Sequence, residues 1–131
     1  MAFGIYAGLS GLVLIALAAH VGATRRRLSI SIGDGANPEM IRAMRGQLNF
    51  VELVPLALIL LLTLALAGAP VVMLHLLGLA LVVGRVLHAL HFIQSDAPGW
   101  QRAAGASLTL LVLLLGAAWL VGLGLWSIVA R

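Results

Sequence analysis

The side chains best suited to chemistry lie where a polar segment meets an apolar one. Arg45, Asn49 and Glu52 are spaced at i, i+4 and i+7, which places them on one face of a helix. The apolar segment 56–67 follows almost directly. Because charged groups at membrane depth are costly, they normally face a bundle interior or a wet cavity and mark a functional site. We therefore expect this face to be the centre of the protein.

A second polar cluster closes a later apolar segment. Arg85, His88 and Phe92 fall at i, i+3 and i+7, again on one helical face. Glu52 with Arg45 or Arg85 suits an ion pair that joins two helices, because buried charges must be paired, and the same residues suit a bound ligand. Asn49 likewise suits either a ligand or an interhelical hydrogen bond. His88 and His91 have a spacing that fits a metal ion, but Glu52 is the only evident third ligand, so we expect no metal site.

The composition restricts the class of protein. The chain has 131 residues, of which 63% are hydrophobic and 9% charged, and its mean hydropathy is +1.15. A soluble domain of this size cannot bury so much apolar surface, which indicates an integral membrane protein. Cysteine is absent, so the chain supplies neither disulfides nor a thiolate. The net charge is +4, and anionic lipid headgroups account for the arginines near helix ends, so we expect membrane lipids and no nucleic acid as partners.

Four apolar segments predict an all-α membrane bundle in a single domain, residues 1–131. Each is long enough to cross a bilayer, and the helices are expected at about 3–23, 38–67, 71–93 and 100–129. Asn37 and Pro38 form a helix start, and Pro55 predicts a kink. The short turn 68–70 makes the second and third helices antiparallel neighbours. His20 and His75 are expected near the membrane interface. Gly8, Gly11, Gly78 and Gly84 are expected to permit close helix contacts.

Arginine distribution predicts the orientation in the membrane. Arg25, Arg26 and Arg27 follow the first apolar segment, whereas a secretory signal carries its positive charges before the apolar segment. Arg42 and Arg45 lie on the same side. The positive-inside rule then places both polar loops, 24–37 and 94–99, in the cytoplasm and both termini outside. The two polar clusters should therefore meet at similar depth.

Both polar clusters resemble those of one family. The run of Arg45, Gln47, Asn49, Glu52 and Pro55 is similar to the glutathione-binding stretch of leukotriene C4 synthase, and 84–88 is more similar to the microsomal prostaglandin E synthase branch. Both belong to the MAPEG proteins, the membrane-associated proteins in eicosanoid and glutathione metabolism. The resemblance covers nearly the whole chain. The short length of the chain and its loop at 33–35 are similar to those of the small bacterial members of the family. This similarity implies a bacterial inner membrane location.

The resemblance implies a four-helix homotrimer that binds glutathione between neighbouring protomers, near the cytoplasmic side. Its activity would be that of a glutathione transferase or peroxidase acting on a hydrophobic small molecule or lipid. The glutathione-binding residues would be Arg45, Gln47, Asn49, Glu52, Arg85 and His88. Arg102 and Arg85 would be catalytic, because a cation near sulfur lowers the thiol pKa and favours the thiolate.

The chain departs from the family pattern at several positions. Leu53 stands where a tyrosine often follows the glutamate, and His88 and Phe92 replace tyrosines of the third helix, so phenolic hydroxyls are lost. These losses keep a second function open, that of a non-catalytic lipid-binding or scaffold protein of the same fold. A small transporter is a third reading, although Glu52 lies near the polar end of its helix and such proteins commonly carry a midplane acid.

Overall fold

The protein is a bundle of four long helices. A computed structural model describes residues 2–94 and 98–130, and this part contains α1 (Ala2–Leu28), α2 (Pro38–Leu66), α3 (Val71–Ile93) and α4 (Gly99–Val129) with no strand. All four helices are long and apolar enough to cross a membrane. The expectation of an all-α integral membrane bundle is confirmed. Residues 95–97 of the expected second polar loop, and Arg131, lie outside the described residues.

The first helix is longer than expected, because it ends at Leu28 rather than near residue 23. Its last turn contains three consecutive arginines, whose charges are favourable near the negative end of the helix dipole. The Arg25 guanidinium also donates to the carbonyl oxygens of Ile30 (3.5 Å) and Gly33 (2.8 Å) beyond the helix. The helix therefore continues through residues expected in the loop.

The second helix begins as expected. The Asn37 side chain accepts hydrogen bonds from the backbone N–H groups of Glu39 (2.9 Å) and Met40 (3.2 Å), and Pro38 is the first helical residue. Pro55 lies inside α2 and has no N–H to donate to the Val51 carbonyl. The helix continues through it, and the kink expected there stays a prediction.

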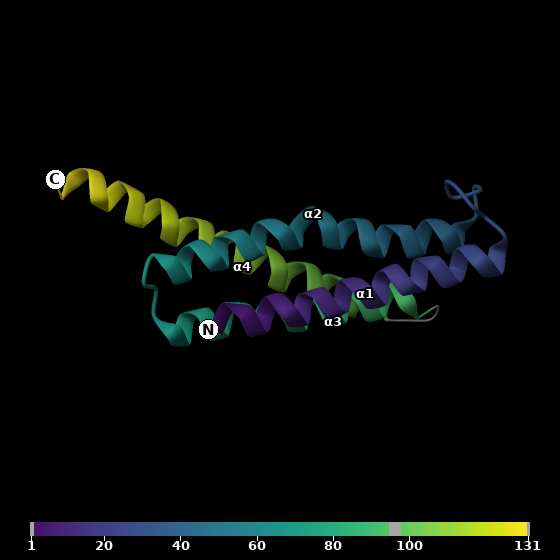
Figure 1. The fold of residues 1–131 in the computed structure, drawn as a ribbon, viewed down its shortest axis with the longest axis horizontal. Helices are drawn as coiled ribbons and strands as arrows, with labels where there is room; N and C mark the ends of the chain where they lie inside the picture. Colours follow the sequence, from purple (N-terminus) through teal and green to yellow (C-terminus); the bar gives the residue numbers. More distant parts are fainter. Residues whose placement is uncertain (1, 95–97, 131) are drawn as a thin grey trace.

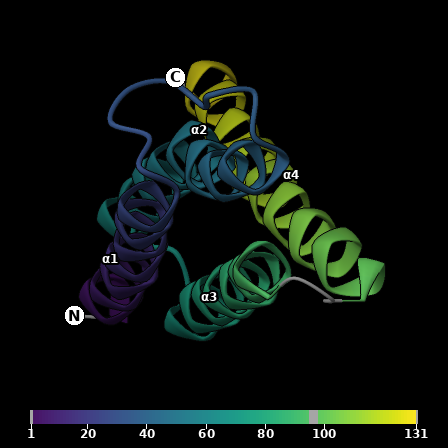
Figure 2. The same cartoon turned by 90° about the vertical axis from the view of Figure 1, so that its right-hand side faces the viewer.

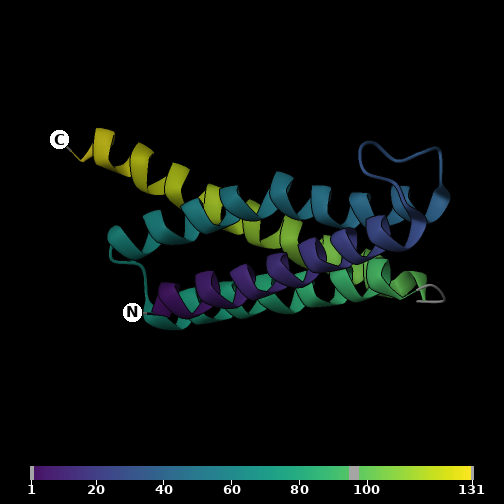
Figure 3. The ribbon, with the colours of Figure 1, turned by 45° about the vertical axis from the view of Figure 1, so that its right-hand side comes forward.

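The helices are arranged around the α2–α3 pair (Figures 1 and 2). Both α1 and α4 contact α2 and α3, whereas within residues 2–94 and 98–130 they do not contact each other. The two termini lie at one end of the bundle and the α1–α2 loop at the other, beside the end of α3. Toward its C-terminus α4 leans away from its neighbours (Figure 3), and residues 121–130 are exposed. The two polar clusters therefore lie toward the same end, as expected.

Glycines create the close contacts of α3 with the other helices. A Cβ at Gly78 would overlap the ring of Tyr6 from α1, and one at Gly46 would lie 2.7 Å from the Phe92 Cβ. At the α3–α4 crossing, Gly84 meets Gly105: a Cβ at Gly105 would lie 2.8 Å from the His88 backbone nitrogen. The expectation for Gly78 and Gly84 is confirmed. By contrast, Gly8 and Gly11 face open space within the described protomer.

The histidine at the far end of the bundle has a specific partner. His75 was expected at the membrane interface, and its side chain is exposed near the start of α3. Its Nδ1 atom lies 2.7 Å from the hydroxyl of Tyr6, and the two rings meet edge to face. This pair fastens the beginning of α1 to α3, one turn from the contact at Gly78.

The α3–α4 crossing predicts a position-specific glycine requirement. Gly105→Ala should lower the free energy of unfolding by about 1–3 kcal/mol, because its Cβ would meet backbone atoms of α3 that cannot rotate away. Gly122→Ala is the matched control on the same helix, since a Cβ there meets nothing within 4 Å. Thermal unfolding in detergent micelles measures both variants. Equal free energies of unfolding for the Gly105→Ala and Gly122→Ala variants would contradict the close approach of α3 and α4 at Gly105.

Candidate functional site

Three helices contribute to a pocket at the loop end of the bundle, which we call the polar pocket. Its volume is about 460 Å³. It brings together most of the residues expected to form a site. The lining consists of Arg45, Leu48, Asn49 and Glu52 of α2, His88 and Phe92 of α3, and Arg102 of α4.

The polar pocket forms because each helix presents a residue at the same level. On α2 the 3.6-residue period places Arg45, Asn49 and Glu52 along one face. The antiparallel course of α3 brings His88 and Phe92 beside them. Arg102 belongs to the first turn of α4. It reaches this level because α3 and α4 cross closely at Gly84 and Gly105.

Arg85, expected among the binding and catalytic residues, does not line the polar pocket. Its side chain is only 1% exposed. One guanidinium nitrogen donates to Asn49 Oδ1 (3.0 Å) and the other to the Gly105 carbonyl (3.2 Å), so Arg85 joins α2, α3 and α4. The interhelical hydrogen bond expected of Asn49 is present, and Asn49 also lines the pocket. Arg85 thus lies outside the pocket lining and orients Asn49, which belongs to that lining, through a hydrogen bond.

Glu52 has no basic partner within the described residues. Its side chain is exposed in the protomer. Within the described residues, the ion pair that the structure contains joins Arg27 to Glu39, outside the polar pocket. The hypothesis of a structural ion pair between Glu52 and Arg45 or Arg85 is therefore wrong. Arg45 and Arg102 are also exposed and line the same pocket. The pocket thus presents one carboxylate and two guanidinium groups to a ligand.

His88 and His91 face different surroundings. The buried ring of His88 lies against Phe92 in the wall of the polar pocket, with ring centroids 4.9 Å apart. The Nδ1 atom of His91 lies 3.3 Å from the carbonyl oxygen of Pro98. In the described part of the chain, no three potential metal ligands gather at one point.

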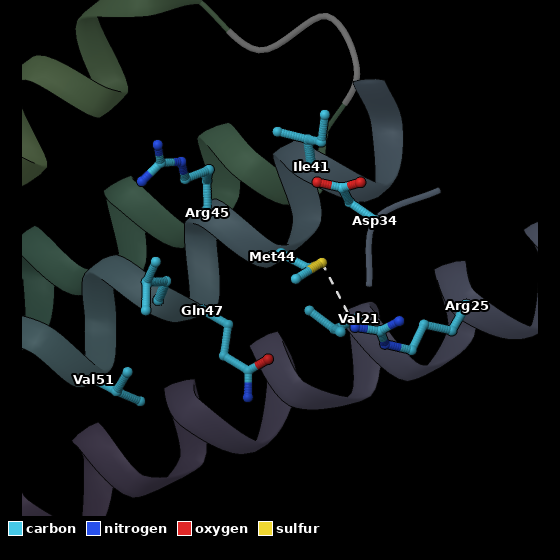
Figure 4. Close-up of a pocket in the computed structure, with 9 residues that line it drawn as sticks. Val21, Arg25, Asp34, Ile41, Met44, Arg45, Gln47 and Val51 are labelled. Atoms are coloured by element: carbon cyan, nitrogen blue, oxygen red, sulfur yellow. Dashed lines mark hydrogen bonds between the residues drawn. The ribbon is translucent and has the colours of Figure 1, made fainter. Parts of the chain in front are cut away.

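Gln47 lies on the opposite side of α2 from the polar pocket. Helical residues two positions apart are separated by about 200° around the axis. Gln47 lies two positions from both Arg45 and Asn49, so it cannot share their face. It lines a second pocket of about 460 Å³, the α1–α2 pocket, whose polar residues are Arg25, Asp34, Arg45 and Gln47. Figure 4 shows Gln47 extending toward α1, while Arg45 leads away from it. The set expected around one ligand is therefore divided between two pockets of the protomer, which have Arg45 and Leu48 in common.

Arg25, for which lipid headgroups are the expected partners, lies in the wall of the α1–α2 pocket. Besides the loop carbonyls, its guanidinium contacts the Met44 sulfur at 3.6 Å (Figure 4). Sequence spacing does not distinguish it from Arg26 and Arg27. Only the extension of α1 through residue 28, and the rotation of that helix, turn Arg25 inward.

The buried arginine predicts a stability difference between two arginines of this region. Arg85→Ala should lower the free energy of unfolding by about 3 kcal/mol, since it leaves Asn49 Oδ1 without its donor and removes a hydrogen bond from the Gly105 carbonyl. Arg45→Ala, at an exposed position of the same pocket, should change it little. Chemical unfolding in micelles measures both. A small effect at Arg85 would show that its hydrogen bonds are dispensable.

Comparison with known proteins agrees with this architecture. The model of the MAPEG family matches residues 3–127. The chain is 35% identical over 115 residues to the inner membrane protein YecN of Escherichia coli strain K12, which covers 88% of this chain and 86% of the relative. The same protein from a second Escherichia coli strain matches equally. The chain is an integral membrane protein and belongs to the MAPEG family, which is associated with glutathione-dependent transferase and peroxidase activity.

Proposed function

We propose that the protein is a glutathione-dependent membrane enzyme, a transferase or peroxidase that acts on hydrophobic electrophiles. The observation that carries this proposal is the unpaired carboxylate of Glu52 in the described protomer. The carboxylate is exposed beside the apolar half of α2 without a cation from the described protomer, and it shares one pocket with Arg45 and Arg102. A charge at this depth is costly unless it is paired, so the pocket suits a ligand that brings its own ammonium group.

Glutathione fits the chemistry of this lining. It carries two carboxylates, one ammonium and a thiol. Arg45 and Arg102 match the anionic groups and Glu52 matches the ammonium. Because Asn49 Oδ1 already accepts from Arg85, the amide N–H groups of Asn49 are left to donate to a ligand. The pocket volume of about 460 Å³ lies within the range of ligand pockets.

Gln47 supports a homotrimeric assembly. Gln47 and Glu52 of one protomer line different pockets, which have only Arg45 and Leu48 in common. The two residues lie about 140° apart around α2, so one protomer does not direct both side chains to the same ligand. A neighbouring protomer that places its α1–α2 face against the polar pocket would bring its Gln47 to the ligand. This arrangement agrees with the family resemblance, in which glutathione lies between protomers. It would also remove the exposed Glu52 from lipid.

Bound glutathione would supply a thiolate nucleophile to an electrophile that enters from the bilayer. In conjugation, a bond from sulfur to an electrophilic carbon forms and the leaving group departs with its electron pair. The chain contributes orientation through Asn49 and Glu52 and positive charge through its arginines. We assign the charge near sulfur to Arg102 rather than Arg85, because Arg102 lines the pocket and Arg85 is occupied by Asn49 and Gly105. With both loops in the cytoplasm, the pocket would lie near the cytoplasmic surface.

A non-catalytic lipid-binding role is the alternative, and Phe92 is the observation that favours it. Phe92 lines the polar pocket where the synthases carry a tyrosine, and the other walls contain no phenolic hydroxyl. A site of this kind would hold a ligand without activating the thiol. Thiolate formation therefore distinguishes the two functions.

Glutathione binding should depend on Glu52. Glu52→Gln should weaken the affinity by about 10- to 100-fold, the effect of losing one charge-assisted hydrogen bond. Glu39→Gln removes a carboxylate from the exposed pair with Arg27, outside the polar pocket, and should leave affinity unchanged. Isothermal titration at millimolar glutathione measures both. Absence of binding to the unmodified protein would refute the proposal.

Thiolate formation should depend on Arg102. Arg102→Ala should raise the pKa of the bound thiol, so the ultraviolet thiolate absorption at pH 7 should fall and appear only at higher pH. Arg26→Ala, at an exposed position of α1, is the matched control. If the unmodified protein binds lipid and glutathione but forms no thiolate and turns over no aryl halide, the non-catalytic alternative holds instead.

A further inference from the structure

Arg42 of α2 caps the end of α3. Its guanidinium donates to the backbone carbonyl oxygens of His91 and of Gln94, the latter at 3.1 Å. The last carbonyls of a helix have no partner inside the helix, and a cation there also opposes the negative end of the dipole. The start of α2 is thus fastened to the end of α3.

The same side chain holds Phe92. The Arg42 guanidinium carbon lies 5.6 Å from the centroid of the Phe92 ring, within the range of a cation–π interaction. One turn along α2, Gly46 lies so close that a Cβ there would come within 2.7 Å of the Phe92 Cβ. Phe92 therefore contacts α2 at two positions, Arg42 and Gly46. Its ring also lies against His88.

Arg42 does not reach the polar pocket itself. It lines a separate hollow of about 360 Å³ with His20, Pro38, Glu39, Phe92 and Ile93. Phe92 is the residue that lines both spaces. Arg42 can therefore influence the polar pocket only through Phe92 and the end of α3.

We propose that Arg42 is a positioning residue, which fixes the Phe92–His88 wall of the polar pocket by capping α3 and stacking on Phe92. Without the planar fork, the end of α3 loses its cap and the Phe92 ring is free to turn into the hollow on the Arg42 side. The His88 ring then loses the neighbour that defines its orientation. The consequence for ligand affinity rests on the proposed function; the consequence for His88 does not.

The test measures two quantities separately: the surroundings of the His88 ring, by NMR, and the KM for glutathione. In protein labelled with ¹³C,¹⁵N-histidine, Arg42→Gln should shift the ring signals of His88, which are assigned through His88→Asn. Arg42→Lys keeps the charge and N–H donors but loses the planar guanidinium that stacks on Phe92, so it should give a smaller shift. Arg26→Gln removes an exposed charge of the same leaflet and should shift nothing. In the Arg42→Gln variant KM for glutathione should rise about 10-fold with a smaller change in kcat, since displaced binding walls are costly.

The outcomes separate this inference from the proposed function. Unshifted His88 signals in Arg42→Gln overturn the inference, and so does an unchanged KM in a protein that turns over glutathione. If the unmodified protein binds no glutathione, the proposed function falls, and the His88 shift alone decides the role of Arg42. If Arg42→Gln does not fold, Arg42→Lys decides: shifted His88 signals support the inference and unshifted ones overturn it.

Discussion

A buried guanidinium determines how three of the four helices meet. Arg85 is 1% exposed in a membrane bundle, so its donors must find acceptors inside the protein. The two terminal nitrogens find Asn49 Oδ1 on α2 and the Gly105 carbonyl on α4, whereas Nε is buried without a partner among the described residues. That carbonyl is within reach because Gly84 and Gly105 let the α3 and α4 backbones approach closely beside Arg85. It also accepts from the Thr109 hydroxyl at 2.9 Å. The glycine crossing and the buried arginine are thus mutually dependent.

The same network prepares the polar pocket. Since Arg85 can only donate, Asn49 must direct its oxygen inward and its amide N–H groups elsewhere. No donor of Arg85 reaches Glu52, which leaves that carboxylate in the pocket with Arg45 and Arg102. Arginines of identical chemistry therefore have different roles because of burial. The buried one joins helices, and the exposed ones present charge to the pocket.

The sequence predicted what depends on local periodicity. The four helices, the start of α2 at Asn37 and Pro38, and the shared face of Arg45, Asn49 and Glu52 follow from apolar length, capping and the 3.6-residue period. A helix-joining role was one expectation for Arg85, but its acceptors could not be predicted, because one of them lies twenty residues away on α4 and depends on how two helices cross. Gln47 was grouped with Asn49 by motif, whereas helical geometry separates them. The end of α1 depended on hydrogen bonds from Arg25 to the loop.

The exposure of the polar pocket bears on the assembly. In an isolated protomer, Arg45 and Glu52 would face lipid or headgroups at a level where Arg85 is fully enclosed. A ligand alone neutralises Glu52 but leaves Gln47 unused on the other face of α2. A second protomer alone would cover the charges but would have to supply a cation for Glu52. The α1–α2 pocket that carries Gln47 offers Arg25, which is occupied by loop carbonyls, and Arg45, which also lines the polar pocket of its own protomer. A ligand held between protomers meets both requirements at once, so we regard glutathione binding and homotrimer formation as coupled parts of one proposal.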